Sequence, residues 1–98
     1  MILDHIAIVT KNLSRDVEWY THKFNCSTSY LDDTWALLKF DNISLALVTE
    51  GEHPNHFAVV DPNVKTDEKA KKHRDGIFFK YESDPSGNVV EIIHKKST

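Results

Sequence analysis

The sequence lacks the features that mark several common protein classes. Its single cysteine, Cys26, excludes an internal disulfide and fits a reducing cytoplasm. Its apolar runs are far shorter than a membrane span, so no membrane partner is expected. The N-terminus has neither the basic stretch nor the apolar stretch of a secretion signal. A cytoplasmic protein is therefore the expectation.

The chain also has no excess of positive charge. Lysine and arginine number 12 against 15 acidic residues, and the net charge is −3. A surface that binds a phosphate backbone needs a basic field, so nucleic acid is not an expected partner. With 98 residues, 40% of them hydrophobic and 28% charged, the chain is sized for one soluble domain, residues 1–98.

The first half has the pattern of one helix among four strands. Alternating and β-branched residues predict strands over the ranges 2–9, 27–31, 34–40 and 43–49. Between the first two strands, Val17, Tyr20 and Phe24 recur at helical spacing. Asn12 or Ser14 is the expected helix cap, and Asn25 the expected left-handed terminator. The order is β-α-β-β-β.

The second half begins the same way and is shorter. Strands are predicted over 55–60, 77–82 and 89–94, with a strong turn at Asp84-Pro85-Ser86-Gly87. The segment 65–74 is polar nearly all round, which predicts a short exposed helix or a loop. The missing part lies between Val60 and Ile77, where a full copy needs a helix and a further strand.

The two halves repeat one another. His5–Val9 matches His56–Val60, and Asn42–Leu45 matches Asn88–Glu91. The sequence thus predicts an α+β fold of two βαβββ units, about 1–50 and 54–96, the second one trimmed. Their sheets would pair into a curved half-barrel with helices on the outside. Equivalent strands would meet at its centre, bringing His5 near His56.

Four pieces in this order carry a family resemblance: the doubled unit, the opening "DHIAI", the helix "NLSRDVEWYTHKFN" and the closing "DPSGNVVEI". Together they resemble the vicinal oxygen chelate superfamily. That superfamily includes glyoxalase I, extradiol dioxygenases, fosfomycin-resistance enzymes and bleomycin-binding proteins. The resemblance covers nearly the whole chain and is weakest over 61–76.

The resemblance implies a metal centre. Carried over position by position, its ligands are His5, His56 and Glu91, and the fourth position, a glutamate in glyoxalase I, is Leu45 here. A site of two histidines and one carboxylate is similar to those of extradiol dioxygenases and fosfomycin-resistance enzymes. The trimmed second unit leaves strand edges and apolar surface uncovered, which predicts a homodimer. In the superfamily, the two units that share one site can come from different chains.

Such a ligand set leaves open positions on a divalent metal for a substrate with two adjacent oxygens. Iron, manganese, nickel, cobalt and zinc all accept these ligands, so the metal stays open. Glu91 shares a strand face with Val89 and Ile93, where an unpaired carboxylate is costly to bury. Lyase, isomerase and dioxygenase chemistry all fit this small-molecule site.

The alternative is a metal-free module of the bleomycin-resistance type that sequesters a small molecule. In either case Trp35, Lys39, Phe79 and Tyr81 lie on strands that can wall the groove. Tyr81 is the candidate catalytic residue, as a hydrogen-bond donor or general acid. The remaining histidines, at positions 22, 53, 73 and 94, are expected to be solvated.

Overall fold

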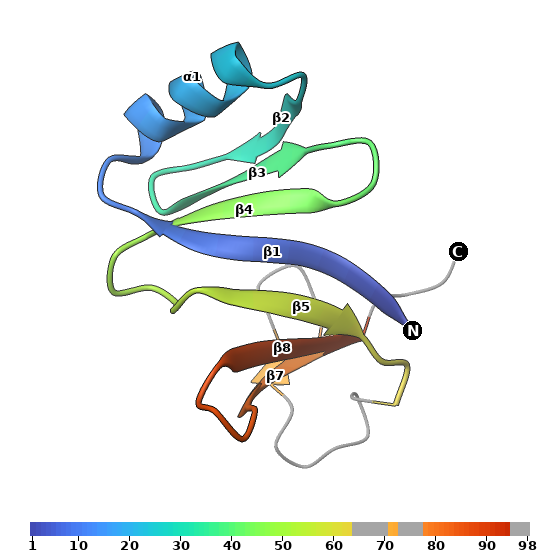
Figure 1. The fold of residues 1–98 in the computed structure, drawn as a ribbon. Coiled ribbons are helices and arrows are strands. Elements are labelled where there is room, and N and C mark those ends of the chain that lie inside the picture. Colours follow the sequence, from blue (N-terminus) through green and yellow to red (C-terminus); the bar gives the residue numbers. More distant parts are fainter. Residues whose placement is uncertain (64–70, 73–77, 95–98) are drawn as a thin grey trace. The chain divides into compact units, whose positions relative to one another are not determined.

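The computed structural model describes residues 1–63, 71–72 and 78–94. It divides into two compact units: His5–Asn55, the N-terminal unit, and Met1–Asp4 with the residues from His56 onward, the C-terminal unit. The elements in chain order are β1 (Ile2–Thr10), α1 (Leu13–Lys23), β2 (Ser27–Leu31), β3 (Trp35–Lys39), β4 (Ser44–Thr49), β5 (His56–Val60), β6 (Lys71–Lys72), β7 (Phe78–Ser83) and β8 (Val89–His94) (Figure 1). Within the described part of the chain, no helix has both the length and the apolar character needed to cross a membrane.

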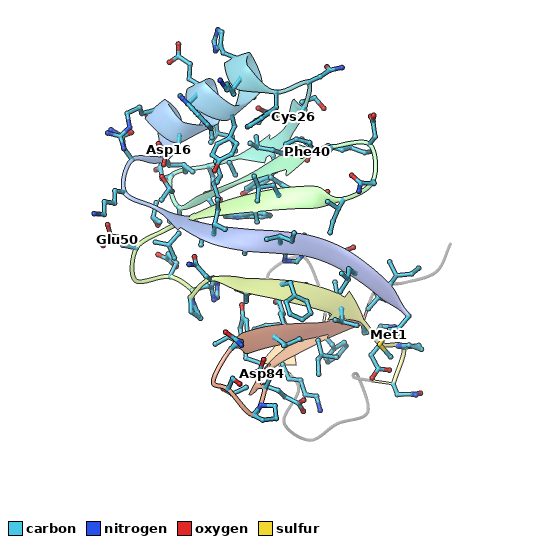
Figure 2. All side chains as sticks on the ribbon, in the orientation of Figure 1. Met1, Asp16, Cys26, Phe40, Glu50 and Asp84 are labelled. Carbon is cyan, nitrogen blue, oxygen red and sulfur yellow. The ribbon has the colours of Figure 1, made fainter. Side chains whose placement is uncertain are left out.

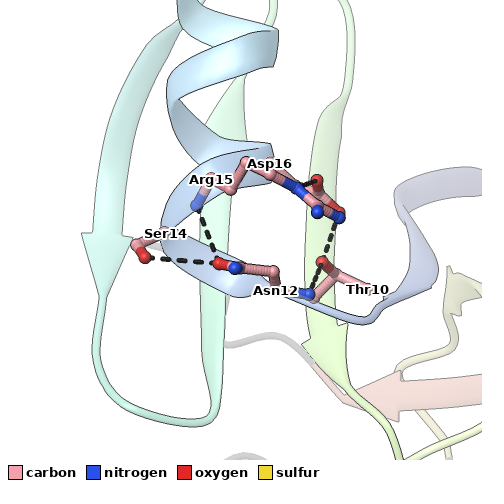
Figure 3. A network of polar contacts seen from close by, with 5 residues as sticks. All are labelled: Thr10, Asn12, Ser14, Arg15 and Asp16. Carbon is pink, nitrogen blue, oxygen red and sulfur yellow. Dashed lines mark hydrogen bonds and ion pairs between the residues drawn. The ribbon is translucent and has the colours of Figure 1, made fainter.

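Helix α1 begins in a small polar network (Figure 3). Asn12 is the cap: its side-chain Oδ1 accepts a hydrogen bond of 3.1 Å from the backbone N–H of Arg15. Ser14 donates its hydroxyl to the same oxygen at 3.4 Å. The Thr10 hydroxyl accepts from the backbone N–H of Asn12 at 3.1 Å and donates to the carboxylate of Asp16. These contacts satisfy N–H groups that the first turn of a helix cannot pair by itself.

The helix ends differently from the prediction. Asn25 does not take a left-handed conformation, since no residue other than glycine has a positive φ in the described ranges. Phe24 is the C-cap and is extended, with φ −125° and ψ 155°, and its N–H bonds to the carbonyl of Tyr20. Its ring lies 6.5 Å from that of Phe40, which packs with Cys26 against the core near the end of α1 (Figure 2). This ring packing favours an extended exit from the helix.

In the N-terminal unit, α1 packs on one face of a four-stranded sheet in the order β2-β3-β4-β1 (Figure 1). Strand β1 runs parallel to β4, and β3 is antiparallel to both β4 and β2. Leu13 and Val17 of the helix form a buried cluster with three residues of the sheet, namely Ala36, Leu38 and Leu47. Because strand side chains alternate, the residues between these positions lie on the opposite side, the far face.

The C-terminal unit repeats this strand arrangement as β5-β8-β7-β6. Strand β5 runs parallel to β8, as β1 runs parallel to β4 in the N-terminal unit. Strand β7 is antiparallel to β8, as β3 is antiparallel to β4. The α+β class and the repeated strand order are thus confirmed. The prediction that this half lacks its second strand is wrong, because Lys71–Lys72 pairs with β7. The rest of the polar segment 65–74 lies outside the described residues.

A five-residue turn, residues 84–88, joins β7 and β8, and Asp84 organises it (Figure 2). Its Oδ1 accepts hydrogen bonds from the backbone N–H groups of Ser86, at 2.9 Å, and Asn88, at 2.8 Å. The side-chain amide of Asn88 also donates a hydrogen bond to Asp84, to Oδ2 at 2.9 Å, and this bond contributes most to lowering the pKa of Asp84. The backbone hydrogen bonds lower that pKa further. Gly87 has φ +86°, a conformation that glycine takes without strain. The equivalent turn of the N-terminal unit, residues 40–43, is one residue shorter.

Replacing the helix cap should destabilise the fold measurably. Asn12→Ala removes the acceptor of the Arg15 N–H and should lower the free energy of unfolding by about 1 kcal/mol. Ser14→Ala is the matched control, because it removes only an exposed contact to the cap and should change stability by less than about 0.5 kcal/mol. Urea titrations of both variants measure the difference, and equal losses would contradict the assignment of Asn12 as the cap.

Candidate metal centre

The C-terminal unit brings two of the predicted ligands together. His56 is the first residue of β5, and Glu91 lies on the neighbouring strand β8, where Ala58 pairs with it. The Nε2 atom of His56 is 3.4 Å from Oε1 of Glu91. Both residues are buried, with 8% and 3% of their surfaces exposed. A carboxylate buried to this degree needs a partner, and the imidazole lies where it can be one.

Tyr81, on strand β7, forms a cluster with His56 and Glu91. It lies directly opposite Glu91 in the β7–β8 ladder, and its ring meets that of His56 edge-on with centroids 5.3 Å apart. Burial, the negative charge of Glu91 and a hydrogen bond to Glu91 together raise the pKa of the Tyr81 hydroxyl. The phenol therefore keeps its proton at neutral pH and acts as a donor to the carboxylate.

The donor atoms of this cluster fit a divalent transition metal. An imidazole nitrogen and a carboxylate oxygen are ligands that zinc, iron, manganese, nickel and cobalt accept. Ile93, on the same strand face as Glu91, is 4% exposed, and the Glu91 carboxylate is thus held in apolar surroundings. A cation bound there would offset the cost of burying the charge of Glu91.

His5 belongs to the N-terminal unit. It lies on β1 opposite Ser44 of β4, is half-buried, and occupies the far face together with Ala7 and Ala46. Its role as the third ligand stays a prediction.

Known proteins resemble this chain in structure, although none of those compared matches it by sequence. No family model and no curated protein matches the sequence. Solved structures do match over nearly the whole chain. A glyoxalase/bleomycin resistance protein/dioxygenase superfamily member from Vibrio splendidus has a TM-score of 0.75 at 10% identity, covering 96% of this chain and 100% of its own. This chain has the vicinal oxygen chelate fold.

Two epimerases share the vicinal oxygen chelate fold with this chain. Methylmalonyl-CoA epimerase from Mycobacterium tuberculosis matches with a TM-score of 0.68 at 17% identity, over 97% of this chain and 88% of its own. The Streptomyces coelicolor enzyme, solved with 2-nitronate-propionyl-CoA, matches with a TM-score of 0.70 at 15% identity, over 97% of each chain. At these identities the likeness establishes the fold.

Within this fold, the register of the strands corrects one predicted position. In the C-terminal unit, His56 pairs with Val89 and Ala58 with Glu91. In the N-terminal unit, His5 pairs with Ser44 and Ala7 with Ala46. The position equivalent to Glu91 is therefore Ala46. Leu45, which the repeat in the sequence had placed there, packs instead against the buried cluster under α1.

The misplaced match has a physical origin in the turns. Aligning Asn42 with Asn88 assumes that both hairpins have equal turns, whereas the second turn holds one residue more. A slip of one residue transfers a strand position to the other face of the sheet. The signal was present in the sequence, since the Asp84–Asn88 stretch with its glycine demands a longer turn than Phe40–Ile43.

The predicted wall residues lie on faces that suit that role. Phe79 packs edge-on against Tyr81, with centroids 5.7 Å apart, on the face of β7 that carries Tyr81. Trp35 and Lys39 lie on the far face of the N-terminal unit, because Ala36 and Leu38 between them pack under α1. Contact of any of them with a substrate stays a prediction.

The other histidines follow the prediction only in part. His22 is exposed on α1, where its ring bonds to the carbonyl of Glu18, and His53 is half-buried. His94 is not fully solvated: its Nδ1 atom is buried and has no hydrogen-bond partner among the described residues. It closes β8 opposite Phe78, and this strand pairing restricts its contact with water. His73 lies outside the described residues.

The raised pKa of Tyr81 predicts a specific alkaline instability. The unfolded phenol ionises near 10, while the folded phenol keeps its proton to higher pH. The contribution of Tyr81 to stability is therefore complete below pH 10 and is lost as the pH rises above it. Tyr81→Phe should lose less stability than the wild type between about pH 9.5 and 11, measured by urea titration of metal-free protein. Parallel losses in both proteins would contradict the burial of this hydroxyl.

Proposed function

We propose that this protein is a metal-dependent enzyme that acts on a small molecule with two neighbouring oxygen atoms. Its metal is held by His5, His56 and Glu91, with Tyr81 as the catalytic residue. The observation that carries the proposal is the buried contact between His56 and Glu91, capped by the Tyr81 hydroxyl.

The ligand number follows from the corrected register. Ala46, at the position equivalent to Glu91, has only a methyl group and supplies no ligand atom. Three protein ligands leave sites open for substrate oxygens and water. The set of two imidazoles and one carboxylate suits iron, manganese, nickel, cobalt or zinc, and does not select one of them.

The chemistry divides between the metal and the chain. A bound divalent metal supplies Lewis acidity toward two adjacent substrate oxygens, which lowers the energy of a developing negative charge. Tyr81 holds a proton at its hydroxyl, which it can deliver as a general acid to a substrate oxygen within reach. Phe79, packed on Tyr81, limits the access of water to this proton donor.

The reaction type is a lyase, isomerase or dioxygenase reaction. Among these, the two methylmalonyl-CoA epimerases of the same fold favour isomerisation, since their names describe that activity.

We place the protein in the cytoplasm as a homodimer. Strand β2 supports the dimer, because all five of its residues are exposed at the edge of their sheet.

The second candidate is a metal-free module that sequesters a small molecule. One observation favours it: Tyr81 and His56 already give the buried carboxylate of Glu91 a donor and a close partner. In that case no cation is required to make the burial of Glu91 tolerable.

Metal content decides between these candidates. Protein purified without a histidine tag and reconstituted with iron(II), manganese(II), nickel(II), cobalt(II) and zinc(II) in turn should retain about one equivalent of metal per chain after desalting. His56→Ala and Glu91→Gln should each lose it, and His5→Ala tests the third ligand separately. His22→Ala, which removes an exposed histidine, is the matched control and should keep the metal. Absence of metal from the wild type under all five conditions would overturn the enzyme proposal.

The corrected register gives a second, independent test. Ala46→Glu adds a carboxylate at the position equivalent to Glu91 and should strengthen metal binding, read as a larger rise in melting temperature on adding zinc. Leu45→Glu is the matched control one residue away. It directs the carboxylate toward the helix core, so it should cost several kcal/mol of stability and give no gain in metal binding. Equal responses of the two variants would show that the register is wrong.

A further inference from the structure

The far face of the N-terminal unit carries one polar row that crosses all four strands. His5 on β1 pairs with Ser44 on β4, Ser44 pairs with Lys39 on β3, and Lys39 pairs with Ser27 on β2. Because these residues are register partners, their side chains lie on the same face. The row offers a ring nitrogen, two hydroxyls and an ammonium group, and it contains no carboxylate.

Lys39 is the charged member of this row. Its side chain is exposed, and no hydrogen bond or ion pair joins it to another residue in the described part of the chain. By contrast, Lys80 of the C-terminal unit pairs with Glu82 at 3.1 Å. An ammonium group flanked by hydroxyl donors favours a negatively charged ligand.

The spacing of the row suits one small molecule. Neighbouring strands lie about 4.8 Å apart, so the backbones of His5 and Lys39, two strands apart, are separated by roughly 10 Å. A lysine side chain can cover about half of that span. A compact ligand with oxygens at the His5 end can thus place a second polar group within reach of the Lys39 ammonium.

The position equivalent to Lys39 in the other unit carries no charge. The residue equivalent to Lys39 in the C-terminal unit is Ser83, since Ser83 pairs with Val89 as Lys39 pairs with Ser44. On the face of the C-terminal unit that carries Glu91, strands β5, β7 and β8 include no lysine or arginine, while the register of the outer strand β6 places Lys71, the partner of Phe79, on that face. Across strands β1 to β5, β7 and β8, Lys39 is therefore the one lysine or arginine on these two faces.

We propose that Lys39 is a specificity-determining residue that binds an anionic group, a carboxylate or a phosphate, on the substrate. This inference rests on the proposed function, because it takes the metal-binding oxygens of the same substrate to lie at the His5 end of the row. Ser44 and Ser27 provide hydroxyl donors on either side of the ammonium group. The substrate class is narrowed to small molecules that combine two vicinal oxygens with a separate negative charge.

Matched ligand pairs test the charge preference. The full-length protein is loaded with zinc, which has no redox chemistry, and titrated by calorimetry with protocatechuate and its neutral methyl ester, and with glycerol phosphate and glycerol. In at least one pair the wild type should bind the anion about fivefold or more tightly than its neutral partner, and the preference should shrink with added salt.

Three variants separate Lys39 from general charge effects. Lys39→Gln should abolish the preference, and Lys39→Arg should keep it. Lys23→Gln removes the same charge from the exposed end of α1 and should also leave the preference unchanged. Binding of none of the four probes, equal binding within both pairs, or a preference that Lys39→Gln retains would overturn the proposal.

The outcome is distinguishable from failure of the proposed function. Zinc binding is measured first, and its absence would count against the metal centre. The same titrations on metal-free protein then test the Lys39 preference by the same criteria.

Discussion

The burial of one carboxylate is the constraint on which the candidate site depends. Glu91 is 3% exposed, and its neighbours on the same face of β8, Val89 and Ile93, are apolar. Water therefore cannot solvate the charge of Glu91. The strand pairing supplies the compensation, because it places Tyr81 opposite Glu91 and His56 on the adjacent strand. The same three side chains thus solve a desolvation problem and are the groups to which we assign metal binding and proton transfer.

Strand alternation assigns every other residue of the sheet to one of two tasks. In the N-terminal unit, Ala36, Leu38 and Leu47 build the core under α1. The residues between them form the far face, where His5 and Lys39 lie. One residue of slippage would exchange these sets, so the ladder between β1 and β4 protects the core and positions polar groups at once.

The two units show how a repeat can keep its framework while its side chains diverge. Each unit retains a parallel pair of strands in which the first paired residue is a histidine, His5 in β1 and His56 in β5. Equivalent positions then differ: Ala46 stands where the other unit has Glu91, and Lys39 where it has Ser83. Such differences allow one half to supply a carboxylate and the other to supply a positive charge, which a strictly symmetric pair could not do.

The sequence by itself determined helix α1, every described strand except β6, and the repeated histidines His5 and His56, because two-residue and helical periodicities and turn residues are local signals. It also indicated Glu91 and Tyr81 as candidate site residues. It did not determine which residue of β4 corresponds to Glu91, since a turn one residue longer shifts the match from Ala46 to Leu45 and alternation then reverses its face. Only the hydrogen-bonded register of the folded strands decides that, as it decides that Ser27, Lys39, Ser44 and His5 share one row. Contacts between residues far apart in the chain exist only once the strands are paired.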